Sequence, residues 1–121
     1  MKVYRVEAKG GGGPYMEHSI EDKDGICMEW AHTAWHDDNC RTPAPSQDDL
    51  DEYGGQFGFR SKRALKQWFL KKWRVAMHKE GLRVSLYNAN RGDVIHSSSG
   101  KQLIFSRRKA KRVSTLSLVS I

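Results

Sequence analysis

The sequence predicts a small α+β domain in which one amphipathic helix packs on a mixed or antiparallel sheet. Three observations lead to this fold class. Residues 61 to about 79 carry apolar side chains at helical spacing, several shorter segments alternate as strands do, and turns rich in Gly, Pro and Ser separate them. With 121 residues, the chain is predicted to be one domain, 1–121, because two halves would each bury too little apolar surface.

The N-terminal half is predicted to begin with a strand and to continue into loops. Residues 3–8 alternate apolar and polar side chains, and the glycines of residues 10–13 end the strand. Residues 26–36 fit either a strand or a short helix. Residues 41–58 consist largely of Pro, Ser, Asp, Gln and Gly, so they are predicted to form a long acidic loop.

The clearest element is a helix from about residue 61 to residue 79. Ser61 is a good N-cap, and Gly81 is placed to end the helix. The side predicted to face the core holds Leu65, Trp68, Phe69, Trp73, Ala76 and Met77. The opposite side holds Arg63, Gln67, Lys71, Arg74 and His78. The helix is therefore expected to bury its aromatic side and to present a basic stripe to solvent.

The segments after the helix are predicted to be strands. Residues 82–87 alternate clearly and follow the helix directly, which predicts a half-buried strand. Residues 94–95 and 102–105 are short apolar runs on either side of a Ser-rich break. Residues 113–121 alternate more weakly and are expected to add a last strand.

Charge is distributed unevenly along the chain. Residues 1–59 hold 5 Lys or Arg and 12 Asp or Glu, whereas residues 60–121 hold 16 and 2. A basic segment, residues 107–112, adds to the basic stripe of the helix, and the two are expected to converge on one surface. The predicted partner-binding residues are Arg63, Lys71, Arg74, Arg107, Arg108, Lys109, Lys111 and Arg112. Such a surface attracts phosphates or acidic proteins, although no motif for reading base sequence is present.

Two further sequence patterns could each mark a binding site, for zinc or for phosphate, or could have only a structural role. Cys27, His32, His36 and Cys40 supply the ligand types that zinc prefers, but their spacing matches no common zinc finger. We favour unliganded side chains over a zinc site. The glycines of residues 10–13 would let backbone amides approach a phosphate, yet they lack the Lys-Ser/Thr of a P-loop, so a strand connection is favoured. No cofactor is predicted from these patterns.

The composition points to a reduced, aqueous compartment. No uncharged run approaches the ~20 residues of a membrane-spanning helix, and the charged N-terminus does not read as an export signal. Two cysteines without a disulfide-rich spacing favour free thiols in a cytosol. A membrane partner is therefore not expected.

The order of several short motifs resembles a family of short accessory proteins carried by bacteriophages and prophages. The motifs are Tyr4-Arg5-Val6-Glu7, Gly13-Pro14-Tyr15, Pro43-Ala44-Pro45 with Asp48-Asp49, Phe57-Gly58-Phe59-Arg60-Ser61 before Trp68-Phe69, and Gln102-Leu103-Ile104-Phe105. The resemblance spans about residues 3–105. It implies that the protein acts in the cytoplasm of a bacterial host and that its target is a host macromolecule.

The same order is similar, more remotely, to minimal ADP-ribosyltransferase-like folds. The resemblance places Arg5 where a first-strand arginine binds the dinucleotide NAD, and Ser61 where a serine follows an aromatic strand. Gln102 stands where those folds have a catalytic glutamate. A neutral amide cannot stabilise positive charge at the anomeric carbon as a carboxylate does, so a degenerate site without transfer activity is the favoured interpretation.

These observations lead to one functional hypothesis and two alternatives. The hypothesis is a phage accessory, anti-defence factor that binds and blocks a host defence or nucleic-acid-handling complex, a host protein or nucleoprotein, through its basic residues. One alternative is an ADP-ribosyltransferase-like enzyme. The other is direct binding of nucleic acid without sequence specificity, which predicts a steep dependence of affinity on salt.

Overall fold

The structure is a computed structural model that describes residues 1–13, 56–96 and 102–121. An antiparallel sheet and two helices confirm the predicted α+β class. The elements in chain order are β1 (Lys2–Glu7), β2 (Gln56–Phe59), α3 (Lys62–Trp68), α4 (Lys71–Lys79), β3 (Arg83–Asn88), the 3₁₀ helix η2 (Arg91–Asp93), β4 (Val94–His96), β5 (Gln102–Phe105) and β6 (Lys111–Leu116).

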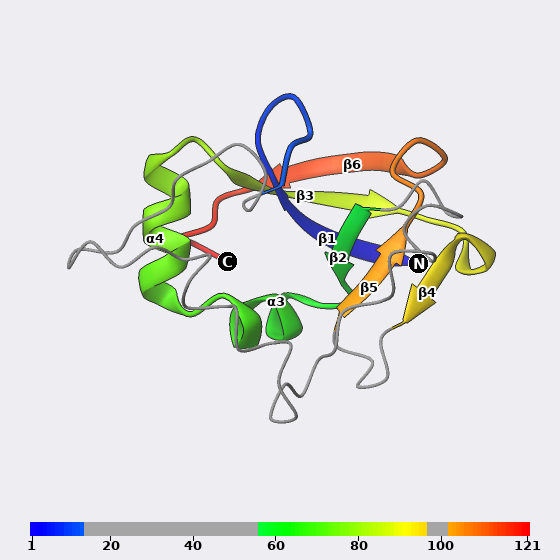
Figure 1. Ribbon diagram of the computed structural model, residues 1–121, viewed down its shortest axis with the longest axis horizontal. Coiled ribbons are helices and arrows are strands. Elements are labelled where there is room, and N and C mark those ends of the chain that lie inside the picture. Colours follow the sequence, from blue (N-terminus) through cyan, green and yellow to red (C-terminus); the bar gives the residue numbers. More distant parts are fainter. Residues whose placement is uncertain (14–55, 97–101) are drawn as a thin grey trace.

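The described strands form one six-stranded sheet in the order β4-β5-β2-β1-β3-β6. Every neighbouring pair is antiparallel, which resolves the choice between a mixed and an antiparallel sheet. Strands β2 and β1 are the two central strands, and β1 also pairs with β3, in register from Lys2 opposite Asn88 to Glu7 opposite Arg83. The first strand therefore lies in the middle of the sheet, between two strands that come later in the chain (Figure 1).

Apolar side chains are buried on both faces of the sheet. The face beneath the helices contributes Val6, Phe59 and Val84 to a core with α3 and α4. The opposite face holds a second cluster that includes Val3, Tyr87 and Phe105. We call these the helix face and the far face. The sequence pattern predicted β3 to be only half-buried, whereas Tyr87 on the far face is 2% exposed.

The predicted single helix over 61–79 is wrong, because the chain forms two helices with a break between them. Phe69 and Leu70 have extended ψ angles of 99° and 162°. The break turns Phe69 into the core, where its ring meets that of Phe59 edge to face at 5.8 Å. No Gly or Pro interrupts residues 62–79, so local propensity gave no sign of the break. Packing of the aromatic side chains outweighs the preference for one straight helix.

Two other predicted boundaries also differ from the structure. Residues 56–58, placed in the acidic loop, belong to β2, where the missing side chain of Gly58 permits close packing. A Cβ at this position would lie 2.6 Å from Cγ1 of Val3 and 3.2 Å from Cε1 of Phe105. The glycine that resembled a loop residue therefore serves close strand packing. The last strand, β6, begins at Lys111, inside the basic segment, and ends at Leu116.

Candidate functional site

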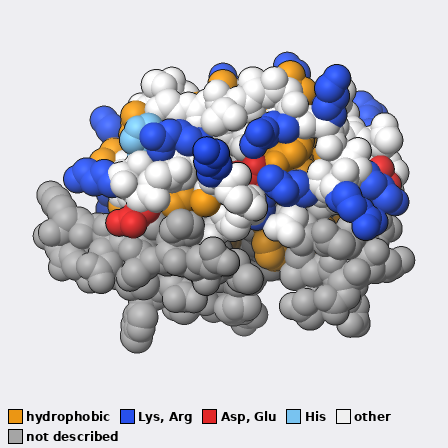
Figure 2. Space-filling model, turned by 90° about the horizontal axis from the view of Figure 1, so that it is seen from above, with side chains coloured by type: hydrophobic (Ala, Val, Ile, Leu, Met, Phe, Trp, Pro, Cys, Tyr) orange, Lys and Arg blue, Asp and Glu red, His pale blue; other side chains and the backbone are white. Residues whose placement is uncertain are grey.

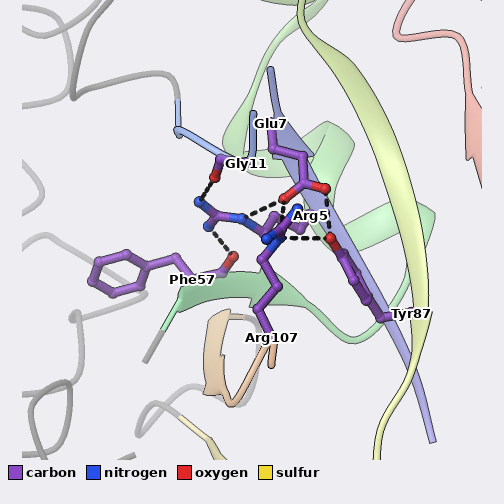
Figure 3. A network of polar contacts seen from close by, with 6 residues as sticks. All are labelled: Arg5, Glu7, Gly11, Phe57, Tyr87 and Arg107. Atoms are coloured by element: carbon purple, nitrogen blue, oxygen red, sulfur yellow. Dashed lines mark hydrogen bonds and ion pairs between the residues drawn. The ribbon is translucent and has the colours of Figure 1, made fainter. Parts of the chain in front are cut away.

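A buried carboxylate lies at the centre of a polar network on the far face. Glu7, at the end of β1, is 3% exposed. Its Oε2 accepts hydrogen bonds from Nε of Arg5 and from Nε of Arg107, each at 3.0 Å. Its Oε1 accepts the hydroxyl proton of Tyr87 at 2.6 Å. One negative charge is thus shared by two guanidinium groups and a phenol (Figure 3).

Arg5 directs all three of its nitrogen atoms inward. Besides the contact with Glu7, its Nη1 donates to the carbonyl oxygen of Phe57 at 2.9 Å, and its Nη2 donates to that of Gly11 at 3.0 Å. Arg5 is 4% exposed. It therefore joins β1, β2 and the glycine-rich loop after β1, and in this arrangement its guanidinium is not presented to a ligand (Figure 3).

Burial and the charge of Glu7 together shift the pKa values of the groups in the network. Burial lowers the pKa of the Arg5 guanidinium from its ordinary value, and the charge of Glu7 opposes that effect. At Arg107 burial also acts to lower the pKa, but Glu7 and Tyr87 outweigh it, and the pKa rises. Burial raises the pKa of Tyr87, and its hydrogen bond to Glu7 raises it further. Tyr87 thus keeps the proton that it donates to Glu7.

The raised pKa of Tyr87 predicts a loss of stability in alkaline solution. Above the ordinary tyrosine pKa of 10.0, the folded protein holds a proton that the unfolded chain has released. The free energy of unfolding should therefore fall as the pH rises through that value. Urea denaturation of wild type and Tyr87→Phe across this range should show the smaller pH slope in the variant. Equal slopes would contradict the assignment, and Tyr4→Phe, on the helix face, is the control.

The structure places two of the residues that the transferase resemblance singled out, Arg5 and Gln102, on opposite faces of the sheet. Phe59 on the helix face pairs directly with Gln102, so Gln102 faces the helices. Arg5 belongs to the opposite, far face. Gln102 is 6% exposed, and its Oε1 makes no hydrogen bond among the described residues. Arg5 and Gln102 thus lie on opposite faces of the sheet, and a common catalytic role for the three residues stays a prediction.

Ser61 has a structural role as the N-cap of α3. Its side chain accepts a hydrogen bond from the backbone N–H of Ala64 at 3.0 Å. Ser61→Ala should therefore lower the free energy of unfolding by about 1 kcal/mol, whereas Ser61→Asp, which keeps an acceptor, should retain most of it. Chemical denaturation of the two variants checks this expectation. Equal stability of Ser61→Ala and wild type would contradict the capping role.

The predicted basic side of the helices is only partly free to meet a partner. Arg63 on α3 and Lys71 on α4 are exposed. Arg74 is half-buried, and its Nε donates to the carbonyl oxygen of Phe69 at 3.1 Å, which supports the break between the helices. Arg63 and Lys71 are thus better candidates for a contact than Arg74.

The basic segment has one anchored residue and four others that are exposed. Arg107 belongs to the network around Glu7, and its Nε also lies 2.7 Å from the Tyr87 hydroxyl. The exposed residues are Arg108, Lys109, Lys111 and Arg112. Of these, Lys109 lies 3.9 Å from Asp93. Arg107 therefore differs from the other basic residues of the segment, because contacts with Glu7 and Tyr87 hold its guanidinium in place.

Helix α4 and the basic segment do not converge as expected. Figure 1 places α4 near one end of the longest axis and the turn between β5 and β6 near the other. Lys and Arg side chains are instead spread across the described part of the face seen in Figure 2. The described residues hold 18 Lys or Arg and 3 Asp or Glu. Positive charge therefore covers an extended area, not one compact patch.

Comparison with known proteins identifies the family. The family model described as bacteriophage T4 Y00F protein matches residues 1–119. The chain belongs to this phage protein family. No curated protein and no solved structure matches the chain. The family match confirms the predicted relation to phage proteins, while the similarity to ADP-ribosyltransferase-like folds stays a prediction.

Other candidates from the sequence are untested or find no counterpart. Cys27, His32, His36 and Cys40, the candidate zinc ligands, lie outside the described residues. Within the described ranges, no group of three or more His, Cys, Asp or Glu side chains could hold a metal ion. Neither described helix has the length and apolar character that crossing a membrane requires.

Sequence reasoning did not identify Glu7 and Tyr87 as functional candidates. One local signal was available, since Arg5 and Glu7 are two residues apart on a strand and so point to the same face. With apolar neighbours on both sides, such a pair suggests a buried ion pair. Tyr87 and Arg107 could not be added, because they lie 80 and 100 residues from Glu7 along the chain.

Proposed function

We propose that this member of a phage protein family is an accessory factor that binds a host defence or nucleic-acid-handling complex through its basic residues and blocks it. The contact is made by Arg63 and Lys71 on the helices together with the basic segment. The protein acts in the cytoplasm of the bacterial host and changes no covalent bond. It blocks the complex by occupying phosphates or acidic side chains that the complex uses for its own contacts.

One observation carries the proposal, namely the excess of positive charge over the described surface. Of the 3 acidic residues among the described ranges, Glu7 is buried in the network and Asp93 lies near Lys109. Little negative charge is left to balance 18 Lys and Arg. Solubility requires no such imbalance, because ordinary surfaces mix both signs. A long, predominantly positive surface suits an extended, negatively charged partner.

Affinity capture from a bacterial lysate, with and without nuclease, tests the proposal. We expect the tagged protein to enrich a defined host complex whose recovery falls as salt is raised. Recovery that survives nuclease indicates contact with the protein part of the complex. Recovery of bulk nucleic acid alone, lost with nuclease, would replace the proposal with direct, non-specific nucleic-acid binding. Failure to enrich any host component would refute both.

A further inference from the structure

The outer edge of the Arg107 guanidinium, formed by Nη1 and Nη2, makes no hydrogen bond with the described residues. A guanidinium has five N–H donors, and only the one on Nε points into the network. Within residues 1–13, 56–96 and 102–121, neither Nη1 nor Nη2 of Arg107 makes a hydrogen bond, and the side chain is 36% exposed. Arg5, in contrast, uses all three of its nitrogen atoms internally. Arg107 is thus the arginine of the network that can still bind a ligand.

The guanidinium of Arg107 is held in position before any ligand arrives. Its Nε lies 3.0 Å from Glu7 and 2.7 Å from Tyr87, and its Cζ lies 5.9 Å from the centre of the Tyr87 ring. On another side it rests against Gly11, where a Cβ would be 2.8 Å from Cζ. Gly11 has a φ of 94°, which favours glycine. The glycine-rich loop therefore leaves room for this side chain.

The charges around this edge favour an anion. Two guanidinium groups share the single carboxylate of Glu7, so the network keeps a net positive charge. Because Arg5 is buried, that charge reaches the surface at Arg107. Lys9, two residues before Gly11, and Arg108, the next residue after Arg107, are both exposed. Two more basic residues are therefore close in sequence to the two residues, Gly11 and Arg107, that meet at this edge.

We propose that Arg107 is a phosphate-binding residue whose Nη1–H and Nη2–H donate to two oxygens of one phosphate group. The planar fork of arginine matches such a pair of oxygens, whereas a lysine offers a single point charge. Because the network already orders the side chain, binding costs little additional conformational entropy. The inference deepens the proposed function and rests on it only for the source of the phosphate, the nucleic acid of the host complex.

The wild-type protein gives the first test. Two-dimensional NMR of the Arg107 Nε–H resonance is followed during titration with inorganic phosphate, with acetate at matched ionic strength, and with a short single-stranded oligonucleotide. We expect phosphate and the oligonucleotide to shift the resonance and acetate to leave it in place. Tighter binding of the oligonucleotide identifies a polynucleotide as the source, and equal binding identifies a small phosphate compound. No shift, or an equal shift with acetate, overturns the proposal.

Substitutions give the second test. Arg107→Lys keeps the positive charge but removes the paired Nη donors. Gly11→Ala keeps the arginine, but the added Cβ displaces its guanidinium. Each should weaken oligonucleotide binding about tenfold, while Arg91→Lys on η2 should leave it unchanged. Affinity of Arg107→Lys within about twofold of wild type overturns the proposal. If a variant does not fold, the wild-type titration still decides.

The two proposals can fail separately. The titrations use purified protein and no host partner, so a failed lysate capture leaves their result intact. A negative titration, in turn, leaves capture through Arg63, Lys71 and the rest of the basic segment untouched.

Discussion

Glu7→Gln is expected to lower the free energy of unfolding by about 3–5 kcal/mol, the range for breaking a buried ion pair from one side. The substitution preserves the size of the side chain and removes its charge. Arg5 then remains buried with no negative charge beside it, and Arg107 loses the carboxylate charge that pairs with its guanidinium. Urea denaturation followed by fluorescence gives the stability of both proteins.

The matched control for this substitution is Glu80→Gln. Glu80 is an exposed acidic residue at the end of α4, so its replacement should change the stability by no more than about 0.5 kcal/mol. A Glu7→Gln variant as stable as the control would show that the carboxylate does not compensate the two arginines. The description of the far face as a charge-balanced network would then be incorrect.

Trp73→Ala is expected to cost about 3–5 kcal/mol of stability, because it leaves a large cavity between α4 and the sheet. Trp73 is 3% exposed and belongs to the core cluster on the helix face. Thermal and urea unfolding should both report the loss. The effect should be confined to stability, since Trp73 is not part of the proposed contact.

Leu70→Ala provides the comparison for the core substitution. Leu70 is three residues before Trp73 and is 56% exposed at the break between the helices. Its truncation removes little buried surface and should change the stability by less than about 0.5 kcal/mol. Equal losses in the two variants would mean that the break is packed differently, with Leu70 inside.

The pattern of the sequence predicted the elements of the fold better than their ends. The strand from residue 83 and the helical region after Ser61 have clear local periodicity, and the strands around residues 94 and 102 coincide with short apolar runs. The break at Phe69 has no local signal, because it arises from packing on Phe59. Gly58 was assigned to a loop on composition, although its role is to let β2 approach Val3.

The candidate site was less predictable than the fold. Arg107 was singled out as one of several basic residues, but its particular position depends on Glu7 on β1 and Tyr87 on β3. Arg5 was singled out through the transferase resemblance, and the structure gives it internal hydrogen bonds instead. Contacts between residues so far apart in the chain follow from the strand order, which no local pattern encodes.

Charge reversal in two regions tests the central claim, that the basic residues make the contact with the host complex. Lys71→Glu/Arg112→Glu alters one exposed residue on α4 and one on β6. Lys2→Glu/Arg91→Glu makes the same change in net charge at exposed positions outside the proposed contact. Recovery of the host complex from lysate at low salt should fall at least about tenfold with the first variant and stay near wild type with the second. Equal recovery with both variants, whether unchanged or equally reduced, would contradict the account.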